Sequence, residues 1–252
     1  MNIGFSTGSI SKGDFKKAIE ILRYSTANVI ELSALRENEL ENLINSLDDL
    51  NLRQFDYVSF HAPSKLYKHS EEWLIEKLQK VIKREINIIV HPDIIVEIKK
   101  WRSLGCFLCI ENMDKRKPVG RTSQDLENIF SSLPEAKFCL DLAHARQVDP
   151  SMTETLTMIK KFRNRLSQIH LSDVNSQSIH EPLNLESILF YHKVSPYIDH
   201  NIPIVLESPV HEENIEREIQ LAELIFNNEK FNTLMSSLNI RLHSLSGQFY
   251  EG

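Results

Sequence analysis

Short apolar runs alternate with longer amphipathic segments from Met1 to about residue 227. The short runs are rich in β-branched residues and predict strands, whereas the longer segments carry apolar residues at helical spacing. We predict eight strands, over residues 2–7, 28–33, 57–62, 86–92, 106–113, 137–144, 166–173 and 202–209. We predict eight helices between and after them, over residues 13–25, 36–50, 70–85, 93–104, 122–132, 151–165, 184–199 and 211–227.

Three of the predicted helices carry residues that typically begin a helix. Ser70 precedes a glutamate-rich first turn, and Thr122 stands three residues before Asp125. Ser151 and Glu154 have the spacing of a capping box, in which each side chain accepts a hydrogen bond from the other residue's backbone N–H. We therefore expect helices to begin next to Ser70, Thr122 and Ser151.

Strict alternation of strands and helices favours a parallel sheet, because each helix connects two parallel strands and covers the sheet. Eight strand–helix pairs in 252 residues match a single (β/α)8 TIM barrel, an α/β fold that typically needs about 250 residues. The alternative is an open doubly wound sheet. No glycine-rich phosphate-binding motif follows a predicted strand, and the chain has only 7 glycines, which disfavours the open sheet. We expect the barrel to span residues 1–227, with a C-terminal helical extension and tail over residues 228–252.

Composition and charge narrow the class of protein. Hydrophobic residues make up 41% of the chain and charged residues 25%, which is ordinary for a globular protein with one core. The sequence shows no signal peptide and no apolar run long enough to cross a membrane, so we expect a cytoplasmic protein without a membrane partner. The net charge of −6 gives no general attraction for nucleic acids, although bound metal ions can still hold phosphate groups. Cys106 and Cys109 form a CxxC motif, but residues three apart on a strand point to opposite faces, so the pair is poorly placed to bind a metal or to close a disulfide. We expect these two residues and Cys139 to be buried thiols.

Polar residues stand where most of the predicted strands end. They are His61, His91, Glu111, Asp141, His144, His170 and Glu207, and Glu31 and Asp173 hold similar positions without a clear role. The C-terminal ends of all strands in a parallel barrel lie at one rim, so we expect these side chains to converge there. Burying several carboxylates and imidazoles together is costly unless a cation balances their charge. Because nitrogen and oxygen ligands suit Zn²⁺ or Mn²⁺, the sequence predicts a metal site at this rim.

These residues and their neighbours resemble the xylose isomerase-like barrel superfamily, which includes endonuclease IV and many sugar isomerases and epimerases. The matching fragments are HAP at 61–63, HPD at 91–93 where the family usually has HPG, EN at 111–112, LDLAH at 140–144, HLSD at 170–173, HEPL at 180–183 and LES at 206–208. The resemblance implies a shared metal core of Glu111, Asp141, His170 and Glu207. Endonuclease-IV-like members hold further ions with histidines that match His61 and His91 on one side and His144 and His180 on the other.

The resemblance therefore implies two or three bound ions, with zinc as the first expectation and manganese as the alternative. One position departs from the pattern of endonuclease-IV-like members. Ser178 stands where that family has an aspartate ligand for its third ion. The third ion is thus the least certain part of the implied site.

Two reactions fit such a site. Several adjacent ions imply hydrolysis of a phosphoester, of the endonuclease IV (AP endonuclease) type that the resemblance suggests, with Glu111 bridging two of them. A single central ion implies isomerisation or epimerisation of a sugar or sugar phosphate, with Glu111 and Glu207 as acid and base. The two additional histidine pairs favour the hydrolase. A barrel that only binds a ligand is the third alternative, and four buried ligands without a use argue against it.

The expected substrate is a small phosphoester or a sugar, with DNA as a further alternative. Lys65 and Tyr67 after the HAPS run, and the KRKPVGR segment at residues 115–121, are the sequence features best suited to contacts with DNA phosphates. A solvated loop explains the KRKPVGR segment equally well.

Overall fold

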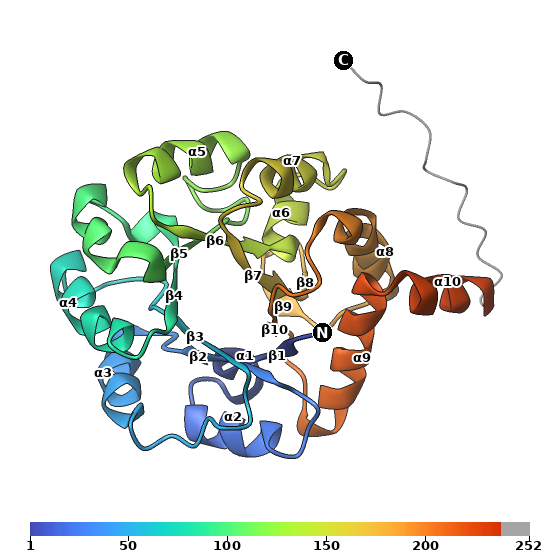
Figure 1. The fold of residues 1–252 in the computed structure, drawn as a ribbon, viewed down its shortest axis with the longest axis horizontal. Helices are drawn as coiled ribbons and strands as arrows, with labels where there is room; N and C mark the ends of the chain where they lie inside the picture. Colours follow the sequence, from blue (N-terminus) through green and yellow to red (C-terminus); the bar gives the residue numbers. More distant parts are fainter. Residues whose placement is uncertain (238–252) are drawn as a thin grey trace.

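Eight parallel strands close a barrel at the centre of the computed structural model, which describes residues 1–237 (Figure 1). The strands follow one another around the barrel in chain order, and β1 completes the ring by pairing with β10. Their bounds are β1 Ile3–Ser6, β2 Val29–Ser33, β3 Tyr57–His61, β4 Asn87–Val90, β5 Leu108–Glu111, β6 Lys137–Asp141, β7 Leu166–Leu171 and β10 Ile204–Leu206. The predicted α/β fold, a single (β/α)8 TIM barrel, is confirmed.

Helices surround the strands and bury their apolar faces against the outside of the barrel (Figure 1). The α-helices are α1 Thr7–Ser11, α2 Phe15–Leu22, α3 Glu37–Ser46, α4 Glu71–Ile82, α5 Ser123–Ser132, α6 Leu142–Val148, α7 Thr153–Lys161, α8 Leu185–Val194, α9 Ile215–Phe226 and α10 Asn228–Ser237. Short 3-10 segments are η1 Pro92–Ile94, η2 Ile98–Phe107, η3 Ser195–Tyr197 and η4 Glu212–Asn214. Within residues 1–237, none of the helices combines the length and the apolar character that a membrane crossing requires.

The inside of the barrel is more polar than its outside. Ile89, Cys109 and Cys139 form a small apolar layer on β4, β5 and β6 that is separate from the main core. Successive side chains on a strand point to opposite faces, so the residues two positions further along these strands share the interior side. Those residues are His91, Glu111 and Asp141, so the interior side of these strands ends in polar residues at the rim.

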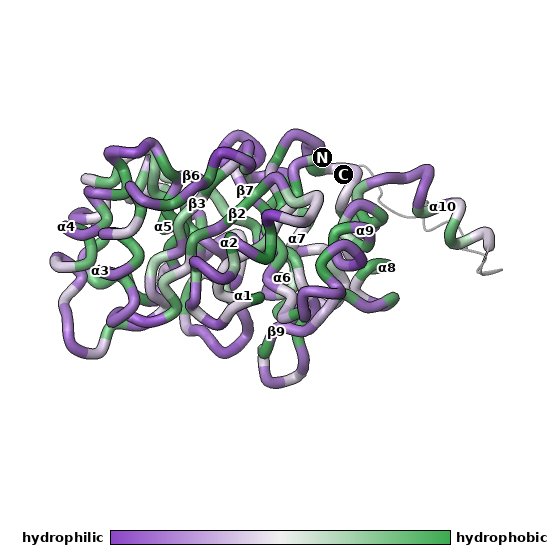
Figure 2. The backbone as a smooth tube through the Cα atoms, turned by 90° about the horizontal axis from the view of Figure 1, so that it is seen from below, coloured by the Kyte–Doolittle hydropathy of each residue, from purple (hydrophilic) through white to green (hydrophobic). Residues whose placement is uncertain are grey.

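Two segments differ from the predicted elements because polar side chains compete for backbone hydrogen bonds. The helix predicted over residues 93–104 is replaced by η1 and η2. Glu71 in the first turn of α4 accepts the backbone N–H groups of Val96 and Glu97, each at 2.9 Å, so those groups are not available to an α-helix. Between β7 and α8, where we predicted only a connection, the short strands β8 Asp173–Val174 and β9 His180–Glu181 form an antiparallel hairpin, labelled by β9 at the lower edge of the molecule in Figure 2.

The helix starts agree with the sequence at two of three positions. Ser70 accepts the N–H of Trp73, and Thr122 forms a capping box with Asp125, as predicted. The capping box predicted for Ser151 and Glu154 is wrong. Asp149 accepts the N–H of Glu154 at 2.8 Å instead, and the carboxylate of Glu154 accepts the backbone N–H of Ser123, the first residue of α5.

At the rim, two glutamates in first helical turns accept hydrogen bonds from the backbone of the loop after the next strand. Glu37 in α3 accepts the backbone N–H groups of Tyr67 and Lys68 at 3.0 and 2.9 Å, beyond the end of β3. Glu71 in α4 does the same for the loop beyond β4, and it also accepts the indole N–H of Trp101 at 2.9 Å. We refer to Glu37 and Glu71 as the loop anchors. Each anchor fixes the loop that follows the next strand along the chain.

The remaining predictions concern the cysteines and the C-terminal segment. Cys109 and Cys139 are buried as expected, but Cys106 is exposed, because β5 begins only at Leu108 and Cys106 lies in η2. In α10, Phe231 is buried and stacks on His192 of α8 with ring centroids 3.5 Å apart. The tail predicted beyond this helix, residues 238–252, lies outside the described residues.

Candidate metal centre

The strand ends bring all eight predicted metal-site residues together at the C-terminal rim. Their side-chain nitrogen and oxygen atoms form three groups that could each hold a metal ion, with the atoms of each group within 4.8 Å of one another. The groups are His61, His91 and Glu111; Glu111, Asp141, His170 and Glu207; and Asp141, His144 and His180. Glu111 belongs to the first two groups and Asp141 to the last two, so the three groups are linked in a row.

Glu111 lies at the centre of this row, and its two oxygens face different histidines. Its Oε2 lies 3.2 Å from Nε2 of His61 and 3.3 Å from Nε2 of His91. Its Oε1 lies 3.2 Å from Nδ1 of His144 and 3.5 Å from Nδ1 of His170. Only 1% of Glu111 is exposed, so water cannot replace these partners. One carboxylate thus joins ligands from four other strand ends.

Backbone hydrogen bonds hold Asp141 and His144, which stand three residues apart at the end of the buried strand β6. Asp141 is the last residue of β6 and the N-cap of α6, and its Oδ1 accepts the backbone N–H of His144 at 2.7 Å. Asn112 holds the same strand end by accepting the N–H of Asp141 at 2.8 Å and donating to its carbonyl at 2.9 Å. These contacts fix one carboxylate oxygen of Asp141 and aim the other into the cluster.

Most of the histidines bind a partner outside the cluster with one ring nitrogen, which fixes the direction of the ring. Nδ1 of His61 lies 2.7 Å from the carbonyl of Ala62, and Nδ1 of His180 lies 2.8 Å from Oγ of Ser172. Their Nε2 atoms then face the carboxylates, at 3.2 Å from Glu111 and 3.5 Å from Glu207 respectively. Metal-binding histidines are usually oriented by such a hydrogen bond from the second ring nitrogen.

Two buried polar atoms in the central group lack the hydrogen bonds that such atoms normally make. Oδ2 of Asp141 and Nδ1 of His170 find no hydrogen-bond partner within residues 1–237. The His170 nitrogen lies 3.5 Å from Glu111 and 3.6 Å from Glu207, so it points between two carboxylates. A divalent cation bound by these atoms would satisfy all of them, so the residues fit a metal ion.

The electrostatics of the cluster are consistent with the binding of a cation. Burial raises the pKa of Asp141 to about 6, despite the opposing effect of His144. Burial favours the neutral form of His144, but the charge of Asp141 and the hydrogen bond to Glu111 outweigh it and raise this pKa to about 10. Burial opposes ionisation of Glu111 too, yet His170 and His91 hold its pKa well below the ordinary value. The charges of the carboxylates and the protons of the histidines thus depend on each other in this cluster, and a metal ion bound there would compete with those protons.

Ser178, at the position of the expected third-site aspartate, does not join the ligand groups. It lines the same pocket as His144 and His180, and its hydroxyl donates to Oε1 of Gln147. Its φ of 56° lies in the left-handed region, which aspartate and asparagine tolerate better than most residues. The third group nevertheless retains three potential ligands, because Asp141 supplies the carboxylate.

Replacing Ser178 by Asp is expected to raise the metal content per chain, because it adds a second carboxylate beside His144 and His180. Elemental analysis of the purified variant measures the change. Ser178→Asn is the matched control, since it has nearly the same size and backbone preference but no charge. Equal metal content in the wild type, Ser178→Asp and Ser178→Asn would refute this role for position 178.

The structure also shows the contacts of Glu31 and Asp173, for which no clear role was predicted. Asp173 accepts hydrogen bonds from Arg146, at 3.0 Å, and from Asn184, and therefore connects the hairpin to α6 and α8. Glu31 is fully buried inside the barrel, where Gln168 donates to it at 2.7 Å. Sequence reasoning missed Gln168 and Asn112. The available signals were that Gln168 stands two residues before His170, on the same strand face, and that Asn112 directly follows Glu111.

The cluster forms the floor of an open pocket of about 730 Å³. Four cationic side chains line its upper part, namely Lys12, Lys65, Arg116 and Lys117. Arg116 is paired with Asp114 at 2.9 Å and Lys117 with Asp93 at 2.5 Å. Among the described residues, Lys12 and Lys65 form no ion pair, so their charges remain available to an anion.

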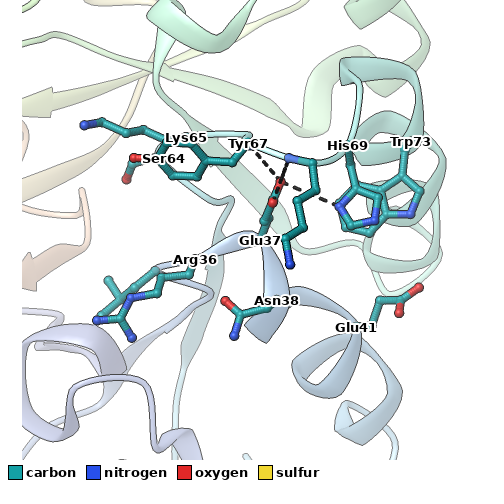
Figure 3. Close-up of a pocket in the computed structure, with 11 residues that line it drawn as sticks. Arg36, Glu37, Asn38, Glu41, Ser64, Lys65, Tyr67, His69 and Trp73 are labelled. Carbon is teal, nitrogen blue, oxygen red and sulfur yellow. Dashed lines mark hydrogen bonds and ion pairs between the residues drawn. The ribbon is translucent and has the colours of Figure 1, made fainter.

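A groove of about 900 Å³ adjoins this pocket across Leu35, Ser64 and Lys65. Figure 3 shows the Glu37 carboxylate reaching the segment from Tyr67 to His69, and the His69 ring stacked on Trp73 at a centroid distance of 3.9 Å. Tyr67 is 79% exposed although Glu37 fixes its backbone. The groove therefore presents an exposed aromatic ring on a fixed loop beside the cluster.

Comparison with known proteins shows the fold. No protein-family model and no curated protein matches the sequence. Endonuclease IV from Thermus thermophilus is 18% identical, with a TM-score of 0.60 over 89% of this chain and 98% of that one. A sugar phosphate isomerase/epimerase from Parabacteroides distasonis is 12% identical, with a TM-score of 0.50 over 90% and 98% of the two chains. SacUVDE is 14% identical, with a TM-score of 0.57 over 95% and 99%.

The fold of the barrel is thus similar to those of an endonuclease IV and a sugar phosphate isomerase/epimerase, as the sequence motifs led us to expect. The similar structures include both an endonuclease and an isomerase or epimerase. The likeness alone therefore does not choose between the two reactions, and the choice depends on the side chains at the rim.

Proposed function

We propose that this barrel is a metal-dependent enzyme that hydrolyses phosphoesters. The observation that carries the proposal is the sharing of Glu111 and Asp141 between three adjacent groups of potential ligands. Shared carboxylates bring ion sites close together, and sites with adjacent ions are typical of phosphatases and nucleases. Reactions that need one ion have no use for His61 and His91, or for His144 and His180.

The eight side chains would hold two or three divalent ions, with Zn²⁺ preferred and Mn²⁺ as the alternative, because the donors are imidazole nitrogens and carboxylate oxygens. When bound, such ions lower the pKa of a water and neutralise charge on phosphoryl oxygens. Glu111 holds the first two groups in contact, and Asp141 holds the last two. Glu207, which is half-buried at the pocket wall, completes the central group and faces the substrate side.

The cations at the mouth of the pocket support an anionic substrate. Lys12 and Lys65 are exposed and line the same pocket as the metal-site residues, although the chain as a whole carries a net charge of −6. A local cationic rim around a pocket raises the concentration of anions there and orients them. The adjoining groove gives a longer phosphodiester room to extend past Lys65 and Tyr67, so DNA is included among the proposed substrates beside small phosphoesters.

The second candidate function is isomerisation or epimerisation of a sugar or sugar phosphate. It is supported by the central group, because Glu111, Asp141, His170 and Glu207 suffice to hold a single ion. In that reaction Glu111 and Glu207 would transfer the proton next to a carbonyl group. The two functions differ in the number of ions that they require.

Elemental analysis of protein purified without chelator separates the two functions. For the hydrolase we expect two or three equivalents of metal per chain and chelator-sensitive cleavage of abasic-site DNA or of a small aryl phosphodiester. One exchangeable ion, together with conversion of a ketose and no phosphodiester cleavage, would overturn the hydrolase in favour of the epimerase. Protein without bound metal, which also fails to bind added Zn²⁺ or Mn²⁺, would rule out both.

A further inference from the structure

A chain of hydrogen bonds runs inside the barrel from its N-terminal end to His170 of the central group. Lys137 donates to Asn87 at 2.8 Å, Asn87 to Tyr57 at 3.1 Å, Tyr57 to Gln168 at 3.0 Å and Gln168 to Glu31 at 2.7 Å. TIM-barrel interiors are usually filled by branched apolar side chains. A polar chain at this place therefore needs a reason.

The direction of donation along this chain is fixed at its start. A lysine ammonium can only donate, so the oxygen of the Asn87 amide must face Lys137 and its NH₂ group must face Tyr57. The Tyr57 oxygen accepts that hydrogen bond, and its own proton goes to Oε1 of Gln168. The NH₂ group of Gln168 is thereby turned towards Glu31. Every bond delivers a donor in the direction of the Glu31 carboxylate.

Glu31 in turn contacts the ring nitrogen of His170 that faces away from the cluster. Its Oε2 lies 3.0 Å from Nε2 of His170 and 3.1 Å from the hydroxyl of Ser59, and both residues in the Glu31–His170 pair are fully buried. Nε2 of Gln168 lies 2.8 Å from the same ring nitrogen, so Gln168 and Glu31 compete for it: the amide would donate to an unprotonated Nε2, whereas Glu31 accepts from a protonated one. A neutral imidazole carries one proton, so a metal ion at Nδ1 requires the proton to be on Nε2. Glu31 is the acceptor that this proton needs.

We propose that Glu31 is a positioning residue that holds His170 in the ring orientation and tautomer required for metal binding. The inference rests on the proposed metal site. Among His61, His170 and His180, only His170 has a carboxylate as the partner of its second ring nitrogen; the other two contact a backbone carbonyl and a serine hydroxyl. A carboxylate partner makes the imidazole a stronger donor to a metal ion. The central ion is thus the one whose binding depends on the barrel interior.

The second oxygen of Glu31 supports this assignment. Oε1 is buried and has no hydrogen-bond partner within residues 1–237. A carboxylate oxygen of Glu31 also lies within 4.8 Å of potential ligand atoms of His61 and Glu207. A buried carboxylate with an unpaired oxygen is costly in a metal-free protein, and a cation in the cluster above it would offset that cost.

Glu31→Gln tests the proposal through metal affinity, measured by competition of the folded protein with a chromophoric Zn²⁺ chelator. Loss of an outer partner of a metal-bound histidine typically weakens metal binding about 10–100-fold, and we expect a loss in that range for the central ion. Glu71→Gln is the matched control, because Glu71 is also a buried carboxylate that accepts N–H groups but contacts none of the cluster residues. It is expected to lower thermal stability and leave metal affinity unchanged.

Glu31→Asp provides a second variant in case the glutamine variant does not fold. It keeps the charge in the barrel but withdraws the oxygen from His170, so it is also expected to weaken Zn²⁺ binding and to alter the visible spectrum of the Co²⁺-substituted protein. Wild-type affinity and an unchanged Co²⁺ spectrum in either folded variant would overturn the role of Glu31. Wild-type protein that binds no metal would instead refute the proposed function, so the two failures are distinguishable.

Discussion

Replacing Glu111 by glutamine is expected to abolish hydrolysis and to remove metal from the first and central ligand groups. The amide has nearly the shape of the carboxylate but lacks its charge, and Glu111 contacts four histidines through both oxygens. Removing one donor from an oxyanion hole typically costs about 10²–10³-fold in rate. We expect a larger loss here, because one residue serves two groups. Turnover of a phosphodiester and elemental analysis of the same preparation measure the two effects.

The fold is expected to survive this substitution, because the main apolar core lies on the outer side of the strands and Glu111 does not contribute to it. Circular dichroism and gel filtration verify the fold before activity is measured. Glutamine at position 71 again serves as the control for loss of a buried carboxylate that contacts none of the cluster residues. A folded Glu111→Gln variant with full turnover would contradict a reaction centred on these ligands.

Replacing His91 by Ala is expected to separate the two candidate reactions. His91 belongs only to the first group, with His61 and Glu111, so its loss should remove one ion and leave the central group complete. The rate of a hydrolysis that needs adjacent ions should then fall by about 10²-fold or more, which is the loss typical when one group that stabilises a transition state is removed. Epimerisation with a single ion should continue at a similar rate.

The matched control for this substitution is His211→Ala, which removes an exposed imidazole outside all three ligand groups. Metal content and phosphodiester turnover should be unchanged in the control. A His91→Ala protein that loses no metal and hydrolyses at the wild-type rate would contradict the multinuclear reaction. Retained conversion of a ketose by the same variant would support the epimerase.

The barrel and the cluster of rim residues could be predicted because both follow from regular features of the chain. Apolar runs of strand length mark the barrel wall, and parallel strands place their ends at one rim. His61, Glu111 and Asp141 are the last residues of β3, β5 and β6, so their convergence follows from topology. Metal binding at these residues, and the identity of the metal, are not contained in that pattern and stay predictions.

Other features depend on contacts between distant segments, which a strand pattern does not contain. Glu31 and His170 are 139 residues apart, and their contact requires both to face the barrel interior at matching heights. The start of α7 differs from the prediction because Asp149, rather than Ser151, reaches the free N–H of Glu154. The helix predicted over residues 93–104 does not form because Glu71, on the preceding helix, takes two of its N–H groups. In each case a tertiary contact outweighs a local preference.

The loop anchors have a consequence for how this rim can change in evolution or by design. Glu37 and Glu71 bind backbone N–H groups, which every amino acid except proline supplies. Side chains at positions 67, 68, 96 and 97 can therefore be replaced without releasing the loops that carry them. New substrate preferences can be acquired at these positions while the barrel stays as it is. The two anchors make this part of the rim a surface whose side chains can vary while its backbone hydrogen bonds stay in place.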